Sequence, residues 1–177
     1  WAAQNVPILA HVDAAAEFED GGDQGLIALR GYAKENAEDT VLAMPTETFT
    51  DKKVIEMGDM VIEVLHLGPA HSPGDTQVWI PALSFMIAGD IAFQERMPPI
   101  FEGTCTSCWI DTWETKLTPL NPTYVIPGHG HPTNLAQVTR YTHDYLVDLR
   151  SKIAAHIEGG GDLAGQVALG GVGLDDR

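Results

Sequence analysis

Two histidines and an aspartate share a setting in this chain of 177 residues, because each follows a short apolar run at a glycine-containing turn. They are His71 in GPAHSPGD, Asp90 in FMIAGDIAF and His129 in YVIPGHG. Side chains at the ends of buried strands are presented at an edge of the sheet, where loops leave room for a ligand. Imidazole nitrogens and carboxylate oxygens are ligands of zinc and similar cations. The three residues are therefore candidate metal ligands, although each one alone is more often structural.

The strands that must position these residues are predicted from short apolar runs bounded by turn residues. They cover residues 6–11, a hairpin of 53–56 and 60–67, a second hairpin of 76–80 and 84–88, and a buried strand over 124–126. The run 60–67 is apolar on both faces, which predicts a sheet covered on both sides.

Two helices are predicted around these strands. In the first, Asp13 serves as N-cap, the Gly21-Gly22 pair breaks the helix, and residues 24–36 resume it. The second begins at Asn134, a candidate N-cap, and continues to Ile157 as the longest regular element.

A third helix is predicted from aromatic residues spaced by four. Trp109, Trp113 and Leu117 lie on one face of it, and Pro119 marks its end. We interpret both tryptophans as core residues rather than as part of a cofactor site.

Composition excludes several classes of partner. Ten Lys and Arg stand against 25 Asp and Glu, for a formal net charge of -15, which disfavours nucleic acids and anionic membranes. No apolar run is long enough for a membrane span, and no signal segment is recognised, so a soluble protein of the cytoplasm or periplasm is expected. Without a repeat or an interior linker, residues 1–177 form one domain, with a Gly-rich, partly ordered tail over 159–177.

The order and spacing of the three motifs resemble the second half of a metallo-β-lactamase-fold hydrolase, from about Val6 to about Ile157. The resemblance implies an α/β fold, an αββα sandwich with a metal site at one edge of its sheets. It also implies that His71 binds a first metal, that Asp90 bridges two metals, and that His129 binds the second. Two zinc ions are the implied cofactors, with iron or manganese as alternatives.

The chain departs from this family at its principal signature, because no H-x-H-x-D-H sequence occurs in it. We therefore expect an N-terminally truncated, partial domain that binds no metal and is inactive by itself. It is either the remainder of a longer enzyme or a natural remnant that acts as a binding or structural domain. In such a remnant the uncovered sheet would favour a homo-oligomer.

With the missing ligands restored, two cations about 3.5 to 4 Å apart would hold a hydroxide as nucleophile and polarise the bond to be cleaved, which makes hydrolysis of a small-molecule substrate the expected reaction. An aspartate at position 90 resembles glyoxalase II and general hydrolase branches, whereas many antibiotic-degrading members have cysteine there. A thioester, lactone or other ester is therefore favoured over a β-lactam. A mononuclear iron enzyme similar to persulfide dioxygenases is the alternative.

Four further residues are candidates for roles near this site. Asp75 is expected to hold the turn after His71 by hydrogen bonds, and His66 is either a partner of a ligand or a strand-face histidine. Cys105 and Cys108 could form a disulfide, a redox pair, two inert thiols or half of a zinc site, although no second cysteine pair exists to complete the last.

Overall fold

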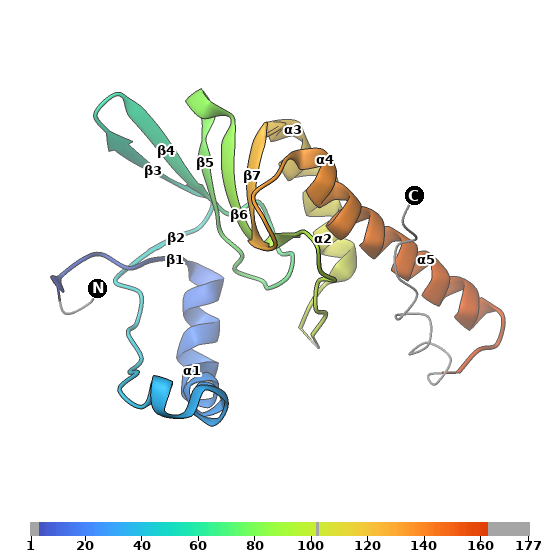
Figure 1. Cartoon of the computed structure of the whole chain (residues 1–177), viewed down its shortest axis with the longest axis horizontal. Helices are drawn as coiled ribbons and strands as arrows, with labels where there is room; N and C mark the ends of the chain where they lie inside the picture. Colours follow the sequence, from blue (N-terminus) through green and yellow to red (C-terminus); the bar gives the residue numbers. More distant parts are fainter. Residues whose placement is uncertain (1–3, 102, 163–177) are drawn as a thin grey trace.

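A five-stranded sheet with helices on one face dominates the structure, a computed structural model that describes residues 4–101 and 103–162 (Figure 1). The strands are β1 (Leu9–His11), β2 (Glu47–Phe49), β3 (Lys52–Met57), β4 (Met60–Leu65), β5 (Gln77–Ile80), β6 (Phe85–Phe93) and β7 (Tyr124–His129). The helices are α1 (Val12–Ala33), α2 (Thr106–Thr112), α3 (Thr118–Leu120), α4 (Leu135–Val138) and α5 (Tyr145–Glu158). The π-helical segments Trp113–Leu117 and Thr139–Asp144 join α2 to α3 and α4 to α5.

The large sheet has the order β3-β4-β5-β6-β7, and β1 and β2 form a separate parallel pair. Both predicted hairpins are confirmed, and Gly58 has the positive φ of 65° that the turn between β3 and β4 requires. Strands β6 and β7 are parallel. Their carboxyl ends therefore meet at the same edge of the sheet, and this edge carries Asp90 and His129.

The core lies between the sheet and the helices. Trp79, Met86 and Val125 are buried and aligned across neighbouring strands. Trp109 and Trp113 pack in the same cluster at 0% and 1% exposure, which confirms their assignment as core residues. A buried aromatic side chain removes about 150 to 250 Å² from water, worth about 4 to 6 kcal/mol of transfer free energy before entropy losses.

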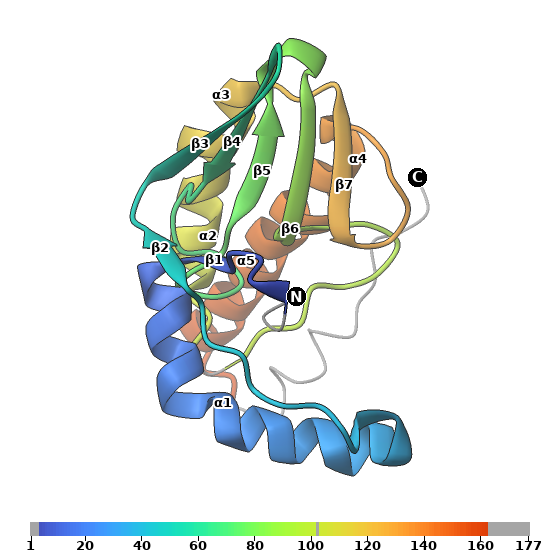
Figure 2. The same ribbon diagram turned by 90° about the vertical axis from the view of Figure 1, so that its left-hand side faces the viewer.

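The opposite face of the large sheet carries no helix within the described residues (Figure 2). Its side chains are apolar at almost every position, and five of them are exposed by more than a third: Ile55, Met57, Met60, Ile87 and Tyr124. The prediction that the strand over 60–67 is covered on both sides is therefore wrong at Met60, which is 38% exposed, but right at the end of β4, where Val64 and Leu65 on opposite faces are each 8% exposed.

Helix α1 differs from its prediction in two ways. It runs unbroken through Gly21-Gly22, and its N-cap is His11, whose Nδ1 accepts the backbone N–H of Asp13. A glycine inside a helix costs only about 1 kcal/mol, which tertiary contacts offset. Gly22 is buried, and its backbone lies close to the side chain of Leu42. Figure 2 shows that α1 is bent rather than ended, and a pair of small residues inside a helix is a common cause of such a bend.

Two strands are longer than predicted. The expected turn at Gly89-Asp90 is wrong, because β6 continues to Phe93 with an irregular register on β7. Gly89, with a φ of 62°, accommodates that irregularity. Strand β7 likewise extends through His129.

The C-terminal helical region confirms its predicted start. The side chain of Asn134 accepts the backbone N–H of Gln137 at 3.1 Å, and α4 begins directly after it. Most of the tail predicted to be partly ordered, residues 163–177, lies outside the described residues. Over the described ranges, none of the helices combines the length and apolar character needed to cross a membrane.

Candidate metal centre

The structure brings His71, Asp90 and His129 together at the edge of the large sheet. The Nε2 atom of His71 lies 3.9 Å from Oδ2 of Asp90, and the Nε2 atom of His129 lies 3.6 Å from Oδ1. Each oxygen of the carboxylate therefore has its own imidazole. This division of ligands is compatible with two cations that share one carboxylate.

Asp75 holds the turn that carries His71. One of its carboxylate oxygens accepts the backbone N–H of His71 at 2.8 Å, and the other accepts the hydroxyl of Ser72 at 2.5 Å. Its backbone carbonyl lies 2.8 Å from Nδ1 of His66, whose ring stacks on His11. Asp75 thus makes turn hydrogen bonds of the kind expected for it, and His66 reaches the site through Asp75 rather than by direct contact.

Aromatic rings surround the His71 imidazole. The ring centroids of Phe101, Trp109 and Phe93 lie 5.4, 5.7 and 5.8 Å away, and the side chain is only 14% exposed. Its Nδ1 is buried and has no hydrogen-bond partner among the described residues. Packing rather than hydrogen bonding to its side chain therefore orients this ring.

The His129 imidazole is held differently. It stacks on Phe93 with centroids 5.1 Å apart and is 40% exposed. Arg96 Nη1 approaches its Nδ1 at 3.2 Å. Because a guanidinium can only donate, this contact requires an unprotonated Nδ1. Arg96 and Phe93 were not identified from the sequence as site residues. The one signal for them in the sequence is that both follow closely after Asp90.

Glycine is required at position 128 for Asp90 to keep its place. A Cβ there would lie 1.9 Å from Oδ1 of Asp90 and 2.8 Å from the carbonyl carbon of Gly89. The backbone of β7 thus passes directly beside the carboxylate, and any side chain would displace it.

A second acidic and imidazole pair lies beside the site. His131 is 83% exposed, and its Nδ1 lies 2.5 Å from a carboxylate oxygen of Glu95. The hydrogen bond from His131 lowers the pKa of Glu95 below its usual value, so this carboxylate stays ionised in more acidic solution than a free glutamate would.

His71, Asp90 and His129 have the donor types and the orientation that a metal needs, but they are too few to complete its coordination. Two imidazoles and a carboxylate are suitable donors, and both Nε2 atoms face the carboxylate. Within residues 4–101 and 103–162, however, no group of three or more His, Cys, Asp or Glu side chains converges closely enough to hold an ion. A zinc ion takes about four ligands, so further donors have to complete each position.

Of the alternatives left open for Cys105 and Cys108, the structure shows a disulfide. It lies at the start of α2, and Thr104 beside it donates a hydrogen bond to the backbone carbonyl of His71 at 3.0 Å.

The fold and the site together define a class of protein: an α/β protein with candidate metal ligands at one edge of its sheet. The family model of the Metallo-beta-lactamase superfamily matches residues 1–129. The chain therefore belongs to the metallo-β-lactamase superfamily, and the fold class expected from its motifs is confirmed.

Solved structures agree on the fold. A metallo-β-lactamase from Pontibacter korlensis matches with a TM-score of 0.61 and 16% identity, over 83% of this chain and 60% of its own. The metallo-β-lactamase IND-7 matches with a TM-score of 0.61 and 16% identity, over 78% and 56%. The B3 metallo-β-lactamase BLEG-1 matches with a TM-score of 0.56 and 24% identity, over 78% and 64%. The chain thus spans about three fifths of these proteins, and among curated proteins no relative matches.

Proposed function

We propose that His71, Asp90 and His129 are ligands in a metal-dependent hydrolase, with Asp90 shared between two metal ions. The single observation that carries the proposal is the division of the Asp90 carboxylate between the two Nε2 atoms. A bound metal would supply a Lewis acid and an activated water nucleophile. We expect the further ligands to come from an H-x-H-x-D-H sequence, if the gene encodes one ahead of Trp1.

The residues around the trio have supporting roles in this proposal. The packed rings fix the His71 imidazole, and Asp75 fixes its backbone. Gly128 leaves the space that the Asp90 carboxylate occupies. Holding ligands in place before the metal arrives lowers the entropy lost on binding, so these contacts favour metal affinity.

For the substrate, we propose a thioester, lactone or other ester in preference to a β-lactam, as in the glyoxalase II-like branch. The argument is the carboxylate at position 90, where many antibiotic-degrading members of the family have cysteine. Zinc is the proposed metal, and iron in the purified protein would favour the dioxygenase alternative.

Metal analysis of the full-length protein tests the ligand assignment. We expect bound metal in the parent protein and a loss of at least half of it in His71→Ala, Asp90→Ala and His129→Ala. His131→Ala is the matched control, because it removes an exposed imidazole two positions from His129 and should keep the metal. Unchanged stoichiometric metal in all three variants would overturn the assignment. The substrate class is tested separately, by comparing the rates at which the parent protein hydrolyses ester, thioester and β-lactam substrates.

The uncovered sheet face supports a second proposal, that this chain self-associates as a binding or structural domain. Five of its apolar side chains are exposed by more than a third, and exposed apolar surface of this kind is what protein contacts bury. Sedimentation of residues 1–177 at micromolar concentration is expected to show a dimer or larger species. Tyr124→Lys, on this face and 61% exposed, should shift it towards monomer, whereas Tyr32→Lys, 91% exposed on α1, should not. A monomeric parent chain would contradict the proposal.

A further inference from the structure

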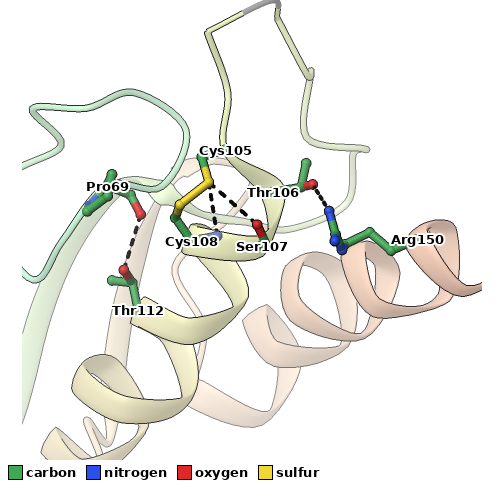
Figure 3. Close-up of a disulfide and its surroundings, with 7 residues drawn as sticks. All are labelled: Pro69, Cys105, Thr106, Ser107, Cys108, Thr112 and Arg150. Carbon is green, nitrogen blue, oxygen red and sulfur yellow. Dashed lines mark hydrogen bonds between the residues drawn. A yellow bond between two sulfur atoms is a disulfide. The ribbon is translucent and has the colours of Figure 1, made fainter.

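A disulfide joins Cys105 and Cys108 at the beginning of α2 (Figure 3). The two cysteines are three positions apart, so the bond closes a very short loop and constrains the unfolded chain far less than a long-range disulfide would. Both residues are partly accessible to solvent. Neither has a role in the proposed hydrolysis, and stabilisation of the fold explains their pairing poorly.

The surroundings of Cys105 favour its release as a thiolate. Its Sγ accepts the backbone N–H of Cys108 at 3.2 Å and lies 3.6 Å from the hydroxyl oxygen of Ser107. Hydrogen-bond donors aimed at a sulfur stabilise the thiolate relative to the thiol. A sulfur whose thiolate is stabilised by such donors is also the better leaving group in disulfide exchange. Attack at Cys108, with Cys105 leaving, is therefore the favoured direction.

The residues directly before the disulfide contact the turn of His71. Thr104 Oγ1 donates to the backbone carbonyl of His71 at 3.0 Å and accepts the backbone N–H of Phe101 at 3.1 Å. The ring of Phe101 in turn lies edge-on to the His71 imidazole at 5.4 Å. A shift of Cys105 would therefore reach His71 through its neighbour Thr104.

The residues directly after the disulfide contact the same turn. Trp109 is fully buried, its ring lies 5.7 Å from that of His71, and its Nε1 donates to the carbonyl of Ile91 at 2.9 Å. One turn further along, Thr112 donates to the carbonyl of Pro69 at 3.1 Å (Figure 3). The disulfide thus lies between two sets of contacts that hold His71.

We propose that Cys105 and Cys108 form a reversible dithiol–disulfide site whose redox state sets the position of His71. In the oxidised form the disulfide ties Thr104 to the helix start, and His71 faces Asp90. Reduction frees Cys105 from Cys108, weakens the hydrogen bond from Thr104, and lets the His71 ring shift. The effect on catalysis rests on the proposed hydrolase function, whereas the redox site itself does not.

The reductant is a dithiol, either a small molecule or a protein with two vicinal thiols. Its first thiolate attacks Sγ of Cys108, which forms a mixed disulfide and breaks the Cys105–Cys108 bond, and Cys105 leaves as a thiolate that takes up a proton. The second thiolate of the reductant then attacks its own sulfur in the mixed disulfide and releases Cys108, which is also protonated. Two electrons and two protons pass to the cysteines, and the reductant becomes a cyclic disulfide.

Thiol titration of the folded, full-length protein tests the site directly. The protein is equilibrated in mixtures of reduced and oxidised dithiothreitol and alkylated with iodoacetamide, and the mass is measured. We expect a gain of two alkyl groups in one two-electron transition under native conditions. Ser107→Ala, which removes the hydroxyl beside Cys105, should shift this transition towards the disulfide. A bond that stays oxidised in excess dithiothreitol until the protein is denatured would overturn the proposal.

The coupling to His71 is tested by NMR of the histidine rings in metal-free protein. The ring resonance of His71, assigned with His71→Gln, should shift between the oxidised and reduced forms, whereas that of His156 should not. Thr104→Val keeps the disulfide but removes the hydrogen bond to His71. Its cysteines should therefore be reduced by dithiothreitol as in the parent, but most of the redox-dependent shift of the His71 resonance should be lost. A Cys105→Ser/Cys108→Ser variant should not respond to dithiothreitol, with circular dichroism as the check on folding.

The outcomes separate this proposal from the proposed function. We expect hydrolysis to fall about tenfold on reduction, because a ligand displaced by about 1 Å costs up to about 100-fold. A redox-dependent shift of His71 without hydrolysis in either form would disprove the hydrolase and leave the redox site intact. Two titrating thiols with an unmoved His71 resonance would overturn the coupling.

Discussion

The two imidazoles at the candidate metal centre are supported in opposite ways. His71 is 14% exposed, packs against the rings of Phe101, Trp109 and Phe93, and is carried by a turn with backbone hydrogen bonds to Asp75. His129 is 40% exposed, stacks on Phe93 alone among the described aromatic rings, and meets Arg96 at its Nδ1.

The difference separates a fixed ligand from an adjustable one. A ring held by packing loses little freedom on binding a metal, but its removal leaves a cavity in the core. A half-exposed ring costs little to remove, and its orientation depends on the stacking with Phe93 and the contact with Arg96. The following substitutions test this contrast, beginning with the carboxylate that both histidines share.

Gly128→Ala should have the largest effect, because its Cβ would collide with Asp90 and separate the carboxylate from both imidazoles. We expect the full-length protein to lose metal affinity about 100-fold and the fold to lose about 1 to 3 kcal/mol. Isothermal titration with zinc and urea denaturation measure the two effects. Gly21→Ala, with open space around its Cβ, is the matched control and should be neutral or stabilising. Wild-type affinity in Gly128→Ala would contradict the close approach of β7 to Asp90.

His71→Ala and His129→Ala should both weaken metal binding but differ in stability. Removing the packed His71 ring should lower the free energy of unfolding of the metal-free protein by about 2 kcal/mol. Removing the half-exposed His129 ring should cost less than about 1 kcal/mol. Urea denaturation monitored by tryptophan fluorescence measures both, and equal losses would remove the distinction between the two histidines.

Arg96→Gln should strengthen metal binding through His129. A neutral imidazole that binds a metal by Nε2 carries its proton on Nδ1, and Arg96 cannot accept that proton. The amide oxygen of glutamine can, and the substitution also removes a positive charge, so affinity should rise about threefold. Competition with a chromophoric chelator measures the gain, and Arg140→Gln, at a residue placed over Tyr141, should leave affinity unchanged. A loss of affinity in Arg96→Gln would show that Arg96 supports the site instead.

His143 provides the smallest expected effect and a reference outside the site. Burial acts to lower its pKa, but hydrogen bonds to Asp144 and Glu114 outweigh it and raise the pKa above its usual value. Its contribution is therefore complete below about pH 6.5, the unfolded value, and is lost as pH rises through the raised folded value. Because both acidic partners are more than half exposed, it amounts to less than about 1 kcal/mol.

Urea denaturation at several pH values measures this contribution. The free energy of unfolding of the parent should decline above about pH 6.5, in part because His143 loses its proton. His143→Gln should remove that part of the decline. An unchanged profile would contradict the raised pKa.

Local patterns accounted for much of the fold. The hairpin of β3 and β4 follows from alternating apolar residues and a glycine with positive φ, and the start of α4 follows from the side chain of Asn134. These signals depend on residues a few positions apart, so they are legible in the sequence. The continuity of α1 and the length of β6 were predicted wrongly, because packing on Gly22 and pairing with β7 outweigh local glycine preferences.

By itself, the sequence determined which residue types are available for metal chemistry and that strands present them, since apolar periodicity and glycine turns act over short distances. Only the tertiary structure decided that both imidazoles face one carboxylate, that Arg96 meets His129 across 33 positions, and that one sheet face lacks a helix within the described residues. The physical reason is that these contacts join segments far apart in the chain. Their energies depend on which strands pair and in which register, and no local pattern contains that information.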